Sequence, residues 1–189
     1  MEILPIFVGM GSRPAVPERT KIGGDLKFRY RLDARLGGFG RFSVRVSDLP
    51  EGCYVASIRY GERDVPESGI EYASGAQLEI TIGADGGHVD GTTVAKDDRP
   101  FGEAVVVLFS ADGRSAPRAL LTTAQGAFHF TGIPPGDYKL MAWDNIGLDE
   151  IGSPELFKLF DNQATVVKLA SSGTVAASVR VISGDAGRL

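Results

Sequence analysis

The residue types that most often do chemistry in proteins are sparse in this sequence. It has two histidines, His88 and His129, and one cysteine, Cys53. A serine or cysteine nucleophile needs a histidine base in reach, and no Gly-x-Ser-x-Gly turn or Cys/His spacing of that kind occurs. No His-Glu-x-x-His pair is present to hold a catalytic zinc ion. The sequence therefore predicts a protein that is not an enzyme and has no metal site and no cofactor.

Acidic residues gather in one stretch of the second half of the chain, at Asp144, Asp149, Glu150 and Glu155. Clustered carboxylates are the oxygen ligands that a calcium ion prefers. Their spacing does not match a calcium-binding loop, so the stronger interpretation is a solvated, charged loop.

Aromatic side chains offer a different chemistry, the stacking of sugar rings. Trp143 is the sole tryptophan, and with Tyr54 or Tyr60 it is the candidate ligand-binding platform for carbohydrate. The alternative is that Phe157 and Phe160 cover Trp143 and form a small satellite core. Apolar residues in the stretch after Trp143 favour this alternative, because they need something to pack against.

Composition places these residues in a chain of many short strands. The 189 residues, 43% of them hydrophobic, suit one large or two small domains, and 25 glycines and 10 prolines fall mostly between alternating apolar runs. The net charge of −4, with acids and bases interspersed, gives no extended basic face, so nucleic acid is not an expected partner.

No apolar run is long enough to span a membrane, and the first residues lack a secretory signal. We expect that the numbering begins inside a longer precursor.

The clearest structural pattern surrounds Pro134-Pro135-Gly136, where alternating apolar residues on both sides predict two strands joined by a tight reversal. The segment Leu49-Pro50-Glu51-Gly52-Cys53-Tyr54 repeats this corner 84 residues earlier. An offset of that length favours one small β-domain following another.

The sequence predicts an all-β fold of two tandem antiparallel β-sandwich domains, residues 1–85 and 86–189, divided at the glycine-rich residues 83–87. Residues 2–8, 26–32, 41–46, 53–60 and 77–82 are the predicted strands of the first domain. In the second domain Ser153-Pro154-Glu155 is typical of a helix start, so a short helical insertion is expected near residues 153–160.

The second domain resembles the carboxypeptidase regulatory-like domains. The resemblance covers about residues 86–183 and rests on Pro100-Phe101-Gly102, the run Thr123-Ala124-Gln125-Gly126-Ala127-Phe128, and the segment around Pro134-Pro135-Gly136. It implies a transthyretin-like β-sandwich of about seven strands, related to carbohydrate-binding folds, with a similar β-domain before it.

Related pilin and adhesin sandwiches carry a Lys-Asn isopeptide crosslink that a glutamate promotes. The position that matches this glutamate is Ala142, while Lys96 stands near the place of the lysine. Without an acid to move protons between amine and amide, no crosslink is predicted.

The resemblance implies a binding or interaction module of a larger exported or cell-envelope protein, with carbohydrate as a candidate ligand. The alternative is a structural spacer that positions a neighbouring receptor or peptidase domain. Either function implies a periplasmic, outer-membrane-associated or extracellular location, and partners among other domains of a parent protein, a cell-envelope protein or a polysaccharide. Fold alone assigns no activity.

Overall fold

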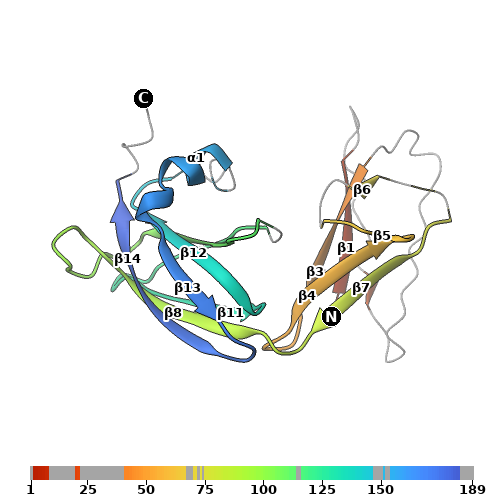
Figure 1. The fold of residues 1–189 in the computed structure, drawn as a ribbon, viewed down its shortest axis with the longest axis horizontal. Helices are drawn as coiled ribbons and strands as arrows, with labels where there is room; N and C mark the ends of the chain where they lie inside the picture. Colours follow the sequence, from red (N-terminus) through yellow and green to blue (C-terminus); the bar gives the residue numbers. More distant parts are fainter. Residues whose placement is uncertain are drawn as a thin grey trace. The chain divides into compact units, whose positions relative to one another are not determined.

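The computed structural model describes residues 2–8, 20–21, 41–66, 70–71, 73, 75–113, 116–146, 151 and 154–183. It divides the chain into two compact units, Met1–Ala84 and Asp85–Leu189. The predicted boundary lies one residue further on, between residues 85 and 86. The described residues are mostly in strands, so the predicted all-β fold class is confirmed (Figure 1).

The first unit has two sheets, with strand orders β2-β1-β3-β6 and β5-β4-β7. The strands are β1 (Glu2–Val8), β2 (Thr20–Lys21), β3 (Arg41–Ser47), β4 (Tyr54–Tyr60), β5 (Arg63–Asp64), β6 (Ile70–Glu71) and β7 (Leu78–Gly83). Phe42 and Val44 of β3 pack with Ile58 of β4, so the core lies between the sheets. The strands predicted at residues 2–8, 41–46, 53–60 and 77–82 are confirmed, and the one at residues 26–32 lies outside the described residues.

The second unit has two layers with the orders β14-β8-β11 and β10-β9-β12-β13, and its described residues form the predicted number of strands, seven. The strands are β8 (Gly87–Val94), β9 (Val105–Ser110), β10 (Arg118–Leu121), β11 (Ala127–Ile133), β12 (Gly136–Trp143), β13 (Thr165–Leu169) and β14 (Thr174–Ile182). Val89, Phe130 and Val179 of one layer meet Leu108 and Leu140 of the other in the main core.

The prediction of purely antiparallel sheets is wrong for β14. This strand runs parallel to β8 along Thr174–Arg180 and parallel to β12 at its last two residues, Val181 and Ile182 (Figure 1). An alternating pattern fixes which face of a strand is buried and does not encode the direction of its neighbours. By pairing with both β8 and β12, β14 joins the two layers.

Both predicted corners carry the chain from one layer to the other. β3 and β4 belong to different sheets of the first unit, and β11 and β12 belong to different layers of the second. The predicted reversal at Pro134-Pro135-Gly136 is therefore not a hairpin, because β11 pairs with β8 while β12 pairs with β9, β13 and β14. Prolines lack the N–H groups that a hairpin would need at this position.

A helical segment covers the outer face of β12. Helix α1 (Pro154–Leu159) and the 3-10 helix η1 (Asp161–Gln163) follow residue 151, which confirms the insertion predicted near residues 153–160. Phe160 packs with Met141, Trp143 and Val107 in a second core, which we call the outer core. In Figure 1 α1 stands beside the end of β12, where these residues lie.

Candidate functional site

The predicted aromatic platform is not formed around Trp143. This side chain is only 2% exposed, and its ring lies 6.4 Å from that of Phe157 and 6.2 Å from that of Phe160. The alternative prediction, that these two phenylalanines cover Trp143, is therefore confirmed. In this structure the indole presents no open face to a sugar ring.

Tyr54 and Tyr60, the other two predicted platform residues, lie in the first unit and have structural contacts there. The Tyr60 hydroxyl donates to the carbonyl of Ala73 at 2.8 Å and accepts from its N–H at 3.1 Å, and its ring stands edge-on to Phe42. The Tyr54 ring lies so close to Gly83 that a Cβ there would be 2.4 Å from Cζ. Both tyrosines therefore pack against their own unit.

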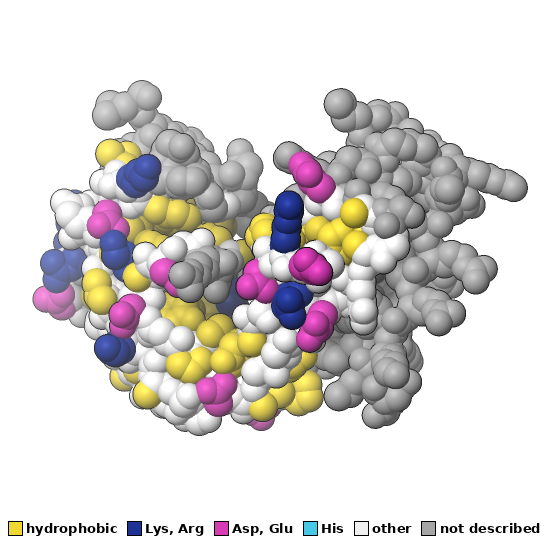
Figure 2. Space-filling model, turned by 45° about the vertical axis from the view of Figure 1, so that its right-hand side comes forward, with side chains coloured by type: hydrophobic (Ala, Val, Ile, Leu, Met, Phe, Trp, Pro, Cys, Tyr) yellow, Lys and Arg dark blue, Asp and Glu magenta, His cyan; other side chains and the backbone are white. Residues whose placement is uncertain are grey.

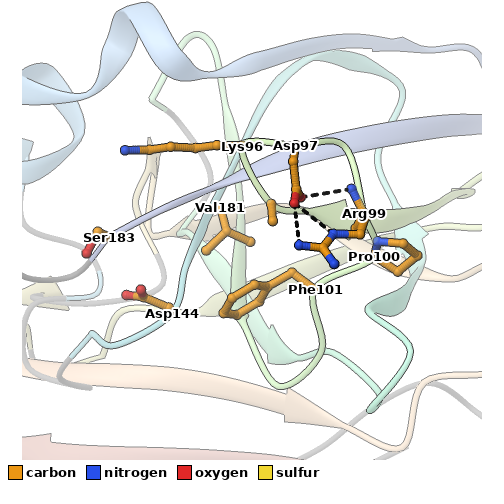
Figure 3. A pocket seen from close by; sticks show the side chains of 9 residues that line it. Lys96, Asp97, Arg99, Pro100, Phe101, Asp144, Val181 and Ser183 are labelled. Carbon is orange, nitrogen blue, oxygen red and sulfur yellow. Dashed lines mark hydrogen bonds and ion pairs between the residues drawn. The ribbon is translucent and has the colours of Figure 1, made fainter.

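An open hollow of about 580 Å³ lies at one end of the second unit, and we call it the 95–101 hollow. It is lined by Ala95, Lys96, Asp97, Arg99, Pro100, Phe101, Asp144, Val181 and Ser183 (Figure 3). In the view of Figure 3 the side chains of Phe101 and Val181 lie between Asp144 and Ser183 on one side and the Asp97–Arg99 pair on the other. The sequence does not predict this site. The residues Pro100-Phe101-Gly102 indicate a family resemblance but do not by themselves indicate a pocket.

The loop that builds the hollow is held in place by backbone bonds. Arg99 accepts at its carbonyl from the N–H of Ala95 at 2.8 Å, and the N–H of Phe101 donates to the carbonyl of Thr93 at 2.9 Å. The fully buried Thr93 hydroxyl donates to the Phe101 carbonyl at 2.5 Å. Arg180 of β14 donates to the Asp98 carboxylate at 2.7 Å. These bonds hold the backbone of the loop that carries Phe101.

The charges at the hollow are mixed in sign. The Arg99 side chain donates to Asp97 at 2.7 Å and, with the Arg99 N–H, lowers the pKa of that carboxyl group. Because the pKa of Asp97 is lowered, the pair persists at a more acidic pH than an ordinary aspartate would allow and is lost as the pH falls through that lowered value. Lys96 is exposed and has no carboxylate partner among the described residues. The hollow thus offers donors and acceptors without a strong net charge.

The structure also brings together two residues that the sequence analysis treats separately. The rings of His88 and His129 are stacked, with centroids 5.5 Å apart and planes 9° apart, and Nδ1 of His129 bonds with Oδ1 of Asp90. His129 lies opposite Asp90 in the pairing of β11 with β8. The alternation of Phe128 and Phe130 places His129 on an outward face, but which strands pair cannot be read from this pattern.

Other predicted features have definite positions. Lys96 lies in the exposed turn after β8, whereas Ala142 is fully buried in β12. Of the acidic stretch, Asp149 and Glu150 and the side chain of Glu155 lie outside the described residues.

Within the described ranges no three His, Cys, Asp or Glu residues are arranged to hold a metal ion, and no helix there is long and apolar enough to cross a membrane. On the face shown in Figure 2, acidic and basic side chains alternate, in keeping with the interspersed charges of the sequence.

No protein-family model matches this chain, and no curated protein matches it. Solved structures similar to it include BcpA, the major pilin subunit of Bacillus cereus, with 17% identity over 55% of this chain and a TM-score of 0.38. The minor pilin GBS52 of Streptococcus agalactiae is 14% identical over 95% of this chain, with a TM-score of 0.35. A third is the dioxygenase domain of a dioxygenase carbohydrate-binding fusion from Streptomyces sp. SirexAA-E, 16% identical over 51% of this chain, with a TM-score of 0.29.

The matched region spans 31% of BcpA, 81% of GBS52 and 80% of the dioxygenase domain. The three proteins include two pilins and one enzyme domain, so the likeness does not select a function. The function of this chain has to be argued from its own residues.

Proposed function

We propose that the second unit is a non-catalytic binding module for a neutral, hydroxyl-rich ligand of the carbohydrate class, within a larger exported or cell-envelope protein. The observation that carries the proposal is the 95–101 hollow with Phe101 in its lining. This site takes the place of the aromatic platform predicted at Trp143, and it lies at the end of the same strand, since Asp144 directly follows Trp143.

The size of the hollow supports a small ligand. Its volume of about 580 Å³ falls within the roughly 300–1,000 Å³ of known ligand pockets. The hollow is open, as a site must be if it takes one or two rings of a longer chain.

The lining supports a ligand with apolar ring faces and polar edges. The half-buried Phe101 and Val181 supply apolar surface for the face of a sugar ring. Lys96 can donate to hydroxyl oxygens, and Ser183 can donate or accept. Because cations and carboxylates both line the hollow, a strongly charged ligand of either sign would meet repulsion as well as attraction.

The experiment that tests this proposal is a titration of the isotope-labelled chain with cello-, manno- and chito-oligosaccharides, followed by NMR. We expect saturable shifts at the amides of residues 94–101, 144 and 181–183. Phe101→Ala should weaken binding about tenfold or more, a loss of about 1.4 kcal/mol. Leu121→Ala is the matched control, because this exposed apolar side chain of β10 does not line the hollow. Trp143→Phe should leave the affinity unchanged.

A structural spacer is the second candidate function, and the short connection between the units favours it. Only residues 84–86 separate β7 from β8, and the Asp85 carbonyl accepts from the N–H of Ser172 at 2.7 Å. If no amide signal shifts in the presence of millimolar oligosaccharide, the binding proposal is wrong, and the structural spacer becomes the preferred function.

A further inference from the structure

The two histidines of the chain lie 41 positions apart in sequence and meet on one surface. His88 and Asp90 alternate along β8, and His129 stands across from Asp90 on β11. All three side chains therefore project from the outward face of this layer, while Val89, which lies between His88 and Asp90 in sequence, is fully buried. The result is a compact group of two imidazoles and one carboxylate on a rigid pair of strands.

The Asp90 carboxylate sets the chemistry of the His129 ring. A carboxylate accepts a hydrogen bond and donates none at neutral pH, so the proton of a neutral His129 resides on Nδ1. The lone pair is then on Nε2, and the side chain is 57% exposed. This carboxylate–histidine arrangement is the one that orients histidine ligands at metal sites and raises their basicity.

His88 has unused hydrogen-bonding capacity. Its Nδ1 is buried and has no hydrogen-bond partner within the described part of the chain, and its ring stacks on that of His129. Buried polar groups in proteins are nearly always paired, so an unpaired imidazole nitrogen requires an explanation. An unoccupied ligand position is such an explanation.

We propose that His88 and His129 bind a divalent first-row transition-metal ion, such as Zn²⁺, Ni²⁺ or Cu²⁺, with Asp90 positioning His129. Imidazole nitrogen is a good ligand for all three ions. Two protein ligands leave the remaining coordination positions to water. Because Nδ1 of His88 is buried, the ion reaches it only after neighbouring side chains move, but the water ligands still distinguish this site from a closed structural zinc site.

Binding requires the rings to turn out of their stacked arrangement, because the lone pair of each nitrogen lies in its ring plane and the two planes are nearly parallel. An ion about 2.0–2.1 Å from each nitrogen brings the two nitrogens closer than stacked rings 5.5 Å apart allow. The exposed His129 ring has room to tilt toward His88, whereas the strand pairing holds both backbones. We accordingly expect changes at the imidazoles and no change in the sheet.

The test uses the full chain without a histidine tag, titrated with ZnCl₂, NiCl₂ and CuCl₂ by calorimetry. With only two histidines, NMR of the imidazole nitrogens reports on each ligand separately. We expect both imidazoles to respond to Zn²⁺, with a stoichiometry of one ion per chain and an affinity that falls as protons compete at lower pH.

Variants separate ligands from a positioning residue. His88→Gln and His129→Gln should each remove measurable binding, and Asp90→Asn should weaken it about 10-fold or more while leaving both imidazoles responsive. Asp137→Asn is the control, because it removes one exposed carboxylate on β12, outside this group; Asp137 is 61% exposed, compared with 45% for Asp90. Circular dichroism melts verify that each variant is folded.

Two results would overturn the proposal: no heat and no imidazole shift at 1 mM ion, or undiminished binding by the double histidine variant. Saccharide binding at the 95–101 hollow uses none of these three residues, so the two proposals succeed or fail separately.

Discussion

At Leu140 and Met141, β12 is buried on both faces, but the two faces are covered in different ways. Leu140 on the inner face and Met141 on the outer face are neighbours in sequence, and both are fully buried. Leu140 packs in the main core between two hydrogen-bonded layers, whereas Met141 packs in the outer core under α1 and η1.

The two covers differ in what holds them. The layer opposite Leu140 is a set of paired strands, while the cover over Met141 has a helix of six residues and a 3-10 helix of three. Helices this short are not stable alone, so side-chain packing must hold them. Equal burial therefore does not imply equal stability, and we expect the outer core to open first.

The largest expected effect comes from deleting side chains on the two faces. Leu140→Ala should lower the free energy of unfolding by about 3–5 kcal/mol, because the rigid layers cannot close the cavity. Met141→Ala should cost about 2–3 kcal/mol, because the short helical cover can settle into the space. Urea unfolding of both variants measures the difference, and equal losses would show that the two cores are equally rigid.

Phe160→Ala should destabilise the helical segment of α1 and η1 without loosening the strands. Removing this ring from the outer core should cost about 3 kcal/mol and expose Trp143 to a quencher such as acrylamide. Hydrogen exchange should speed up at residues 154–164 and stay slow in β8 and β14. Equal acceleration in the strands would mean that the cover and the sheets open together.

Tyr138→Phe probes one hydrogen bond on the inner face. The Tyr138 hydroxyl donates to the carbonyl of Pro134 at 2.7 Å, and the side chain is 5% exposed. Losing this donor should cost about 1–2 kcal/mol, since the carbonyl is left without that partner. Tyr60→Phe in the first unit is the matched control at a more exposed site, and it should cost less. Thermal melts give both values.

The smallest effect is expected from the ion pair between Lys139 of β12 and Asp161 of η1. With Asp161 54% exposed, Asp161→Asn should cost at most about 1 kcal/mol, and less in 1 M salt. A loss comparable to that of Phe160→Ala would mean that charge, and not packing, holds the cover.

Much of this contrast could be predicted from the sequence. Alternation places Tyr138 and Leu140 on one face of a strand, and the Ser153-Pro154-Glu155 start predicts the helix whose phenylalanines cover Trp143. These signals are local: a period of two, a helix start and apolar residues that need a partner.

The positions of both candidate sites could not be predicted in this way. The stacking of His88 on His129 depends on β8 pairing with β11, and the 95–101 hollow depends on β14 bringing Val181 and Ser183 to the loop. Such pairings join residues far apart in the chain. Local patterns carry no information on which strands become neighbours.

The location of β14 also has a consequence for how the chain is made. This strand is the last in sequence order, yet it sits in the middle, between β12 and β8. Within this unit a ribosome delivers β8 first and residues 174–182 last. The edge of β8 that β14 covers therefore waits unpaired until the rest of the unit is made, whereas the end of β12 waits only through the synthesis of residues 144–173. We expect completion of the second unit to be slow and dependent on chaperones, because its central pairing joins the two ends of its sequence.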